Sequence, residues 1–288
     1  MGAAALPKLG LIAGGGALPV LLAERCRAAG RPVFVVRLRG FAAEGFEEVE
    51  SAEAGIAELG RAIELLRGAG CRSVCFAGIV ARPDFAALKP DLRGLKALPG
   101  AVAAARRGDD ALLRYLLAEF EREGFMVEGA HAVDAALTLP EGPLGAVAPG
   151  PEHQADIARA LATARSIGAM DIGQGAVVAD GLVLAVEAQE GTAAMLRRCA
   201  ELPPTVRGSA QARRGVLAKA PKPIQERRVD LPVIGPETIE LAAAAGLAGV
   251  VGEARGVLVI DRPGVIAAAD RLGLFVAGVG ARAAEGGA

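Results

Sequence analysis

The chain has 288 residues, which is enough for two domains of ordinary size. Its 32 Lys and Arg residues balance 33 Asp and Glu residues, giving a formal net charge of −1. This balance argues against a general nucleic-acid-binding protein, which normally carries a basic excess. No window of 18 uncharged apolar residues occurs, so no transmembrane helix is expected.

The cysteines point to a reduced, cytosolic protein. Cys26, Cys71, Cys75 and Cys199 are scattered, and no second cysteine pair or nearby histidine completes a zinc site. We interpret all four as small, reduced core residues. The N-terminal sequence MGAAALPKLG lacks the charged region and apolar core of a secretory signal.

The first half of the chain alternates between strand-like and helix-like segments. Residues 8–13 fit a buried parallel strand, and residues 18–29 have helical apolar spacing. Further strands are predicted at 31–38, 71–80 and 125–130, and further helices at 56–67 and 111–123. This alternation predicts an N-terminal α/β domain over residues 8–137, with a Rossmann-like parallel sheet covered by helices.

A glycine turn follows the first predicted strand. Gly14, Gly15 and Gly16 would let the backbone approach a phosphate or ribose at the N-terminus of the next helix. Arg82 lies just beyond the strand at 71–80, where ligands of open α/β sheets bind, so it is a candidate phosphate contact. A ligand-free turn and a surface arginine are the alternatives. The glycine spacing is not GxGxxG, and the end of the second predicted strand has no acidic residue that could bind a ribose.

The second half of the chain differs from the first in composition and in its predicted elements. Residues 138–151 are rich in proline and glycine and are interpreted as a linker. A C-terminal α/β domain with a mixed sheet is predicted over residues 152–280, including a hairpin around Asp180 and Gly181. Its other predicted elements are helices at 152–168, 193–199, 236–245 and 265–272 and strands at 256–260 and 274–279.

Two further turns in this half are candidate substrate contacts. Thr192 is expected to cap the helix at 193–199, and Gly191 would allow a ligand close to its N-terminus. A capped helix without a ligand is the alternative. Gln174, in the glycine-rich turn 171–175, is the other candidate.

The loop from Gly215 to Gly235, GVLAKAPKPIQERRVDLPVIG, concentrates charge on a stiff backbone. Its prolines fix φ and remove backbone donors, so we expect an ordered extended loop. Its central charged residues are Lys219, Lys222, Arg227, Arg228 and Asp230. Such a set suits an anionic, metal-bridged ligand such as a pyrophosphate, and a solvated charged loop is the alternative.

Three segments, taken in order, resemble one known family. LGLIAGGGALP, DIGQGAVVADGLVLAVEAQEGT and KAPKPIQERRVDLPVIGPETI are similar to the UDP-2,3-diacylglucosamine pyrophosphatases of the LpxI type, and the resemblance runs over about residues 8–280. It implies a Mg²⁺-dependent (or Mn²⁺-dependent) enzyme of lipid A biosynthesis. The enzyme would hydrolyse UDP-2,3-diacylglucosamine to lipid X (2,3-diacylglucosamine 1-phosphate) and UMP. The resemblance also implies a cytoplasmic homodimer that is peripheral on the cytoplasmic face of the inner membrane.

The resemblance and the chemistry of pyrophosphate hydrolysis together suggest roles for individual residues. The family's essential aspartate lies in the segment that reads DLP here, which makes Asp230 the expected catalytic residue and metal ligand. Asp171 or Glu187 would complete the metal site, because Mg²⁺ needs few carboxylates. Lys219, Lys222 and Arg227 would offset the phosphate charge during catalysis. One departure is Ala193, at a position where an acidic residue is expected.

Two other classes of function remain open on the sequence. The glycine turn also suggests a nucleotide-sugar or dinucleotide oxidoreductase, and two α/β domains also suit a small-molecule binding protein. Neither would release UMP from UDP-2,3-diacylglucosamine, so that assay separates the three. The two histidines, His131 and His153, provide no Ser-His-Asp or Cys-His catalytic set.

Overall fold

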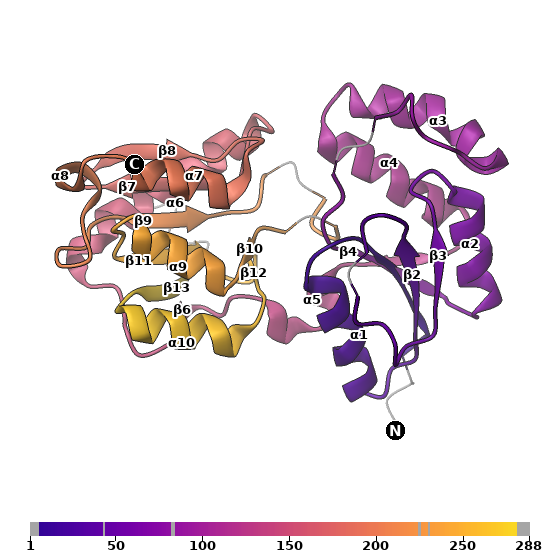
Figure 1. Cartoon of the computed structure of the whole chain (residues 1–288), viewed down its shortest axis with the longest axis horizontal. Coiled ribbons are helices and arrows are strands. Elements are labelled where there is room, and N and C mark those ends of the chain that lie inside the picture. Colours follow the sequence, from indigo (N-terminus) through magenta and orange to yellow (C-terminus); the bar gives the residue numbers. More distant parts are fainter. Residues whose placement is uncertain (1–5, 43, 82–83, 224–225, 230, 281–288) are drawn as a thin grey trace. The chain divides into compact units, whose positions relative to one another are not determined.

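The computed structural model describes residues 6–42, 44–81, 84–223, 226–229 and 231–280 (Figure 1). The chain forms two compact units. Unit 1 comprises the described residues up to Ala135 together with the later segment Glu226–Val229, and unit 2 comprises the other described residues. The chain therefore leaves unit 1, returns to it for four residues, and leaves it again.

Unit 1 contains a five-stranded sheet in the order β3-β2-β1-β4-β5, and every pair in it is parallel. The strands are β1 (Leu9–Ala13), β2 (Val33–Leu38), β3 (Ser51–Ala54), β4 (Ser73–Ala77) and β5 (Met126–Glu128). The helices are α1 (Leu18–Ala28), α2 (Leu59–Gly68), α3 (Leu92–Ala105), α4 (Asp109–Arg122) and α5 (Ala130–Val133). The predicted parallel sheet with helices is confirmed.

Continuous apolar runs explain the centre of this sheet. All five residues of β1 are buried, as expected for a parallel strand covered on both faces. Phe76 and Phe120 meet edge to face, with ring centroids 5.1 Å apart. Val229, from the returning segment, packs against the same core cluster. A distant part of the sequence thus covers some of the core of unit 1.

The four cysteines are buried free thiols, as the sequence predicted. Burial raises the pKa of Cys75 to about 12 and that of Cys71 to about 11. Both side chains are therefore protonated at neutral pH and behave as small core residues.

Unit 2 contains a six-stranded mixed sheet in the order β6-β13-β11-β9-β7-β8. The strands are β6 (Gly142–Pro143), β7 (Gly175–Ala179), β8 (Leu182–Val186), β9 (Val216–Lys219), β11 (Gly249–Glu253) and β13 (Phe275–Val279). A separate parallel pair joins β10 (Val233–Ile234) to β12 (Leu258–Val259). Strands β9, β11 and β13 are parallel, whereas β7 runs antiparallel to both neighbours. The predicted mixed sheet and hairpin are confirmed.

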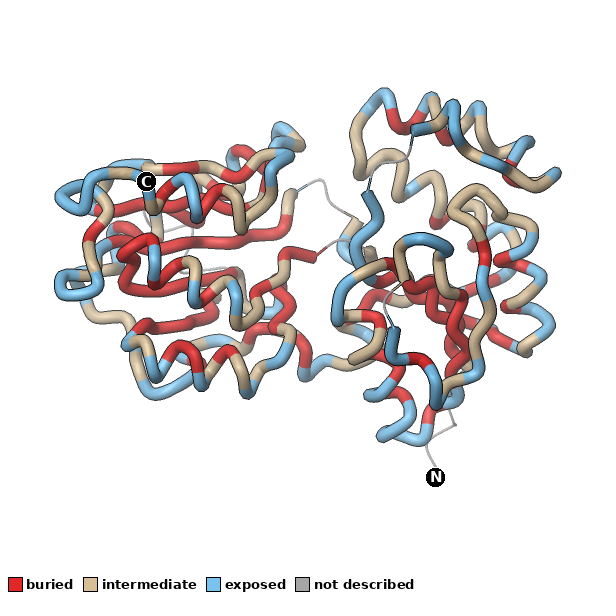
Figure 2. The backbone as a smooth tube through the Cα atoms, viewed as in Figure 1, coloured by how far each residue is buried: buried red, intermediate tan, exposed pale blue. Residues whose placement is uncertain are grey.

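Helices cover both faces of the unit 2 sheet, because successive strand residues point to opposite sides. Leu217 belongs to the cluster with residues of α7 (Gly191–Ala200), α9 (Pro236–Ala244) and α10 (Arg262–Leu272). Its neighbour Val216 belongs to the cluster with α6 (Gln154–Ala169). Figure 2 shows the strands of unit 2 as largely buried. The remaining short helices are η1 (Ala135–Leu137), η2 (Pro151–His153) and α8 (Pro204–Arg207).

Residues 138–151, interpreted from the sequence as a linker, take part in unit 2. They contain β6, whose Pro143 pairs with Ala277 of β13. Thr138 forms a bridge with Leu258.

Within the described part of the chain, no helix has both the length and the apolar character needed to cross a bilayer.

Candidate active site

One edge of the unit 2 sheet gathers several of the predicted site residues. Lys219 is the last residue of β9, and it pairs with Gly175 at the start of β7. Glu187 directly follows β8, and its amide donates to the Gly175 carbonyl at 2.8 Å. The carboxyl ends of parallel strands are where α/β proteins place their ligands. Topology therefore brings Lys219, Glu187 and the turn 171–175 together.

Lys219 and Glu187 are buried and joined by the hydroxyl of Thr192. Lys219 is 4% exposed and Glu187 is 7% exposed. Lys219 Nζ donates to Thr192 Oγ1 at 2.7 Å, and Thr192 Oγ1 donates to Glu187 Oε1 at 2.8 Å. Lys219 Nζ also donates to the Val233 carbonyl at 3.2 Å. Buried charges persist only when they are paired and hydrogen-bonded, and this cluster satisfies most of that need.

One atom of the cluster lacks a hydrogen-bond partner. Glu187 Oε2 is buried and accepts no hydrogen bond from any residue that the structure describes, and Lys219 Nζ lies 3.9 Å from it. A buried carboxylate oxygen without a donor is costly, and such atoms occur where a ligand or ion binds. Glu187 therefore keeps one oxygen available at this edge of the sheet.

Two glycines allow the turn 171–175 to approach Glu187. A Cβ on Gly173 would lie 2.0 Å from the Glu187 carbonyl oxygen, and one on Gly175 would lie 2.6 Å from Glu187 Oε2. The Gln174 carbonyl accepts from the Ala220 amide at 3.0 Å, which ties this turn to the loop after β9. The glycines in DIGQG thus serve close packing around the buried carboxylate.

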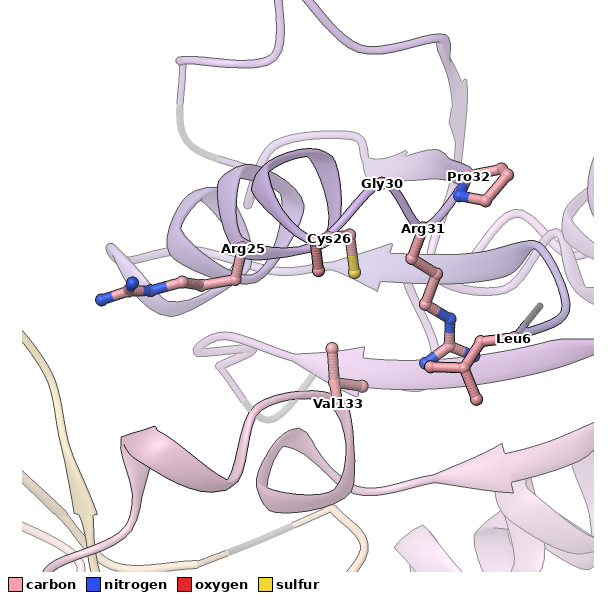
Figure 3. A pocket seen from close by; sticks show the side chains of 8 residues that line it. Leu6, Arg25, Cys26, Gly30, Arg31, Pro32 and Val133 are labelled. Carbon is pink, nitrogen blue, oxygen red and sulfur yellow. The ribbon is translucent and has the colours of Figure 1, made fainter. Parts of the chain in front are cut away.

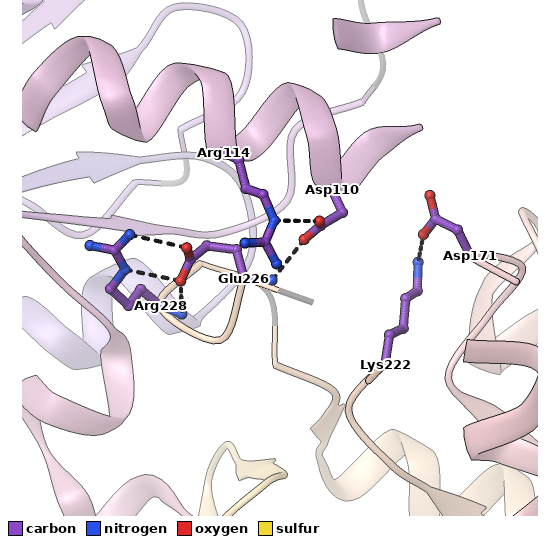
Figure 4. Close-up of polar contacts among 6 residues, drawn as sticks. All are labelled: Asp110, Arg114, Asp171, Lys222, Glu226 and Arg228. Atoms are coloured by element: carbon purple, nitrogen blue, oxygen red, sulfur yellow. Dashed lines mark hydrogen bonds and ion pairs between the residues drawn. The ribbon is translucent and has the colours of Figure 1, made fainter. Parts of the chain in front are cut away.

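Asp171 and Lys222 form a second, more accessible charged pair beside this cluster (Figure 4). Lys222 Nζ donates to Asp171 Oδ1 at 2.7 Å, and the Lys222 and Asp171 side chains are 14% and 23% exposed, respectively. Asp171 adopts a left-handed φ of 57°, a conformation that costs energy in a residue other than glycine. Its neighbours Met170 and Ile172 are 64% and 40% exposed. A carboxylate held in a strained turn thus lies between two exposed apolar side chains.

Arg227 and Arg228 belong to the returning segment Glu226–Val229 of unit 1. Glu226 and Arg228 form a double hydrogen bond at 2.9 and 3.0 Å, and Arg228 Nη1 donates to Glu121 at 2.6 Å (Figure 4). The Glu226 amide donates to Asp110 at 2.7 Å. The hydrogen bonds from Arg228 hold the pKa of Glu226 below its ordinary value. Arg228 is therefore engaged in anchoring the segment to α4.

Arg227 lies in the same segment as Arg228. Burial, together with the charge of Arg227, lowers the pKa of His131, so that histidine is neutral at pH 7. Lys219 and Lys222 belong to unit 2, whereas Arg227 belongs to unit 1.

The glycine turn of unit 1 has a clear packing role. The Gly14 amide donates to the Ala77 carbonyl, and the Gly15 amide donates to the Ile79 carbonyl, both at 2.8 Å. A Cβ on Gly14 would lie 2.8 Å from the Ile79 carbonyl oxygen. Gly16 has a left-handed φ of 83°. These glycines let two chain segments cross, and the first two amides already have partners.

The remaining predicted residues fall into two groups. Asp230 and Arg82 lie outside the described residues. Gly191 has a left-handed φ of 76°, and no atom of the described residues lies within 4 Å of the position that a Cβ would take there. Thr192 does not cap α7, because the cap position is Glu190 and the threonine hydroxyl is used by Lys219 and Glu187 instead.

Glu253 is a residue of this edge that sequence reasoning missed. It ends β11, the unpredicted neighbour of β9, and Arg165 Nη2 donates to it at 2.8 Å. The apolar run Gly249–Val251 after the turn at Gly246 was the available signal.

The described residues contain no group of three or more His, Cys, Asp or Glu side chains arranged to hold a metal ion. Mg²⁺ commonly needs only one or two carboxylates besides substrate phosphates and water. Glu187 Oε2 and the carboxylate of Asp171 are the oxygen donors here that suit it. Both face a lysine, which offsets part of their attraction for a cation.

A cavity of about 260 Å³ lies elsewhere in unit 1, beside the residues that precede β2 (Figure 3). It is lined by Leu6, Arg25, Cys26, Ala29, Gly30, Arg31, Pro32 and Val133. Its one buried charge, Arg31, donates to both Glu128 oxygens at 2.9 and 2.7 Å and to Ser73 at 3.0 Å. This arginine is thus committed to a structural ion pair, and none of the predicted site residues lines the cavity.

Comparison with known proteins adds independent evidence. Family models described as the LpxI N-terminal domain and the LpxI C-terminal domain match residues 8–137 and 140–277. The chain is 65% identical over 272 residues to "UDP-2,3-diacylglucosamine pyrophosphatase LpxI" of Caulobacter vibrioides, covering 94% of this chain and 97% of the relative. A solved structure of CobK precorrin-6A reductase is similar at a TM-score of 0.31 and 13% identity, covering 96% and 88% of the two chains. The resemblance seen in the sequence is confirmed, and the chain belongs to the LpxI family.

Proposed function

We propose that this chain hydrolyses the pyrophosphate bond of UDP-2,3-diacylglucosamine to lipid X and UMP, as a step of lipid A biosynthesis. The observation that carries the proposal is the 65% identity to the Caulobacter pyrophosphatase over nearly the full length of both chains. The reaction adds one water molecule across a P–O–P linkage, so it requires charge neutralisation and an oriented water rather than a redox cofactor.

The charged edge of the unit 2 sheet supports this chemistry. Lys219 is held in place by Thr192 and the Val233 carbonyl, so its ammonium is positioned before any ligand arrives. Lys222, on the loop that follows, is the more exposed of the two. Two fixed ammonium groups can neutralise charge that moves onto phosphate oxygens when the bond breaks. We assign this role to Lys219 and Lys222, together with Arg227.

We propose Mg²⁺ as the cofactor, with Mn²⁺ as a substitute. Asp171 and Glu187 would hold it together with Asp230 and the substrate phosphates, because these side chains provide the oxygen donors that the ion prefers. When bound, the ion would act as a Lewis acid on a phosphoryl oxygen. The buried Glu187 oxygen without a hydrogen bond supports this assignment.

Exposed apolar side chains near the candidate sites suit a lipid substrate. In unit 2, Met170 and Ile172 flank Asp171. In unit 1, Ile79 is 74% exposed and Val80 is 38% exposed. Ile79 forms a bridge with Gly15, so both side chains lie beside the glycine turn. Burial of acyl chains against such groups contributes roughly 25 cal/mol per Å² of apolar surface. We propose that Met170 and Ile172 of unit 2 contact the acyl chains of the substrate.

The proposal is tested by incubating the purified protein with UDP-2,3-diacylglucosamine and Mg²⁺ and measuring UMP. Asp230→Asn should keep the fold and lose turnover by about a hundredfold to ten-thousandfold, the range of a positioned acid–base group. Asp180→Asn is a matched control, because Asp180 is an exposed hairpin aspartate paired with Arg214. Absence of UMP with the wild-type protein would refute the proposed function.

The same experiment run in ¹⁸O-labelled water identifies the attacked phosphorus. The label appears in UMP if the uridine-side phosphorus is attacked and in lipid X if the sugar-side phosphorus is attacked. The family resemblance leads us to expect the sugar-side phosphorus.

Retained turnover in Asp230→Asn at saturating Mg²⁺ would move the catalytic assignment to Asp171 or Glu187.

A diacylated substrate resides in a bilayer, so we propose that the enzyme works at the cytoplasmic face of the inner membrane as a peripheral homodimer. Light scattering on the purified protein tests the dimer, because it gives the molar mass in solution. A mass near the 29.1 kDa of a single chain would contradict it.

A further inference from the structure

Helix α3 is placed differently from the other long helices of unit 1. It packs against α4 and α2, so it forms an outer layer beyond the helices that cover the sheet (Figure 1). Its buried residues are small: Gly94, Ala101, Ala104 and Ala105. A helix whose fully buried positions are glycine and alanine can lie close to its neighbours, and its opposite face is left exposed.

That opposite face combines large apolar side chains with cations. We call the exposed residues of this face, with Lys89 just before the helix and Arg106 and Arg107 just after it, the α3 outer face: Lys89, Leu92, Leu95, Lys96, Pro99, Ala103, Arg106 and Arg107. Their spacing of three and four residues places them on one stripe. Leu92 is 82% exposed, the highest value among the exposed large hydrophobic residues that the structure describes, and Leu95 is 57% exposed.

The cations of this surface have no carboxylate partners. Lys89, which precedes the helix, and Lys96, Arg106 and Arg107 form no ion pair with any described residue. The single carboxylate between residues 89 and 107 is Asp91, which caps the helix by accepting from the Gly94 amide at 2.7 Å. Residues 89–107 thus contain five cations and one carboxylate in a chain whose net charge is −1, so this segment is a local concentration of positive charge.

We propose that the α3 outer face docks on an anionic lipid surface. Two exposed leucines flanked by unpaired cations suit the boundary between lipid headgroups and acyl chains, where apolar insertion and charge attraction add. The positive charge of this face favours an anionic lipid surface over a protein partner, because a protein interface would need a larger, better packed apolar centre. The inference rests on the proposed function, since an enzyme acting on a diacylated substrate must reach a membrane.

Vesicle sedimentation with the full-length protein tests the surface without any substrate. The protein should bind vesicles of phosphatidylcholine with 30% phosphatidylglycerol and bind pure phosphatidylcholine far more weakly, and 0.5 M salt should reduce the difference. Lys89→Gln with Lys96→Gln should weaken partitioning about 30-fold, because each cation near an anionic surface adds about a factor of five. Leu92→Ser with Leu95→Ser should weaken it by at least about tenfold.

Matched control variants separate this surface from general effects of charge and hydrophobicity. Arg72→Gln with Arg159→Gln removes two exposed arginines that lie outside α3. Met126→Ser with Leu182→Ser removes two exposed apolar side chains elsewhere. Both controls should bind within about twofold of wild type. The inference is overturned if the wild-type protein does not bind anionic vesicles, or if the controls lose as much binding as the α3 variants.

Activity assays keep this inference distinct from the proposed function. Turnover of detergent-dispersed substrate should be unchanged in the α3 variants, whereas turnover of substrate embedded in anionic vesicles should fall with their binding. If vesicle binding depends on α3 but no substrate is hydrolysed, only the proposed function fails. If the substrate is hydrolysed but the α3 variants bind vesicles as well as wild type, only this inference fails.

Discussion

The hydroxyl of Thr192 joins two buried, oppositely charged side chains, accepting from Lys219 Nζ at 2.7 Å and donating to Glu187 Oε1 at 2.8 Å. The helix residue thereby fixes the ends of two strands against each other. Its hydroxyl is the only group among these contacts that both accepts and donates, so a side chain that can do only one would break the chain of hydrogen bonds.

Thr192→Val tests this bridge with little change of shape. We expect a loss of about 1–3 kcal/mol in the free energy of unfolding, because the variant leaves Lys219 and Glu187 without the shared hydroxyl. Turnover should fall as well, since Lys219 is no longer held in place. Urea denaturation and the UMP assay measure the two effects. Thr192→Ser, which keeps the hydroxyl, should retain most of both; an equal loss in the serine variant would show that packing matters more than the bridge.

Asp171→Asn tests the proposed metal ligand at a strained position. Asparagine tolerates a left-handed φ, so the fold should be maintained, whereas removal of the charge should raise the Mg²⁺ concentration needed for half-maximal activity by about tenfold or more. Asp180→Asn is the control, because Asp180 also has a left-handed φ, of 48°, in the hairpin turn. The assignment fails if the Mg²⁺ dependence of both variants matches that of wild type, or if chelation with EDTA leaves wild-type turnover intact.

Glu226→Gln tests the anchor on α4 and should have a pH-dependent effect. At pH 7 we expect a loss of about 1 kcal/mol in stability, since the variant weakens the double hydrogen bond to Arg228. The folded-state pKa of Glu226 is lowered from 4.5, so its contribution is present above that pH and is lost as the pH falls through the lower folded-state value. The difference between wild type and variant should therefore shrink below about pH 4.5.

The exposed pair of Arg197 and Glu237 provides the comparison for that anchor. Their side chains are 58% and 71% exposed, so Glu237→Gln should change stability by no more than about 0.5 kcal/mol at any pH. Denaturation at pH 7 and pH 3.5 gives all four values. A pH-independent effect of Glu226→Gln would contradict the role of its charge.

Gly14→Ala should destabilise the protein by about 1–3 kcal/mol, because the new Cβ would lie 2.8 Å from the Ile79 carbonyl oxygen. Gly68→Ala is a control with the opposite expected effect. No atom in the described part of the chain lies within 4 Å of its Cβ position, and an alanine in α2 should add about 0.5–1 kcal/mol of stability. Thermal denaturation of both variants measures the two changes. A Gly14→Ala variant as stable as wild type would show that Ile79 and its neighbours can move aside.

Local patterns were sufficient to predict much of the fold. The apolar run of β1 and the Asp180-Gly181 hairpin were both readable, because each depends on residues close together in the sequence. Strand β3, with the sequence SAEA, was missed because it is short and lacks apolar alternation. Helix α3 was missed because Gly94, Pro99 and Gly100 interrupt its pattern, although Pro99 is accommodated within the helix.

The site was less predictable, because its contacts join distant segments. The sequence suggested Thr192 as a helix cap, and only the fold reveals that its hydroxyl lies between Lys219 and Glu187. Likewise, the glycines at 173 and 175 predicted only a turn. In the structure they are needed because Glu187 packs too close for a Cβ at either position. A single sequence contains no signal for which distant side chains will meet, so residue types were predicted better than their partners.

The return of Glu226–Val229 to unit 1 has a consequence for synthesis on the ribosome. Residues 136–225 must be made before Val229 can cover the core of unit 1. At about 5–20 residues per second, this takes roughly 5–18 s. During that interval the nascent first unit exposes apolar surface to chaperones, and a fragment ending at Ala135 would expose it permanently.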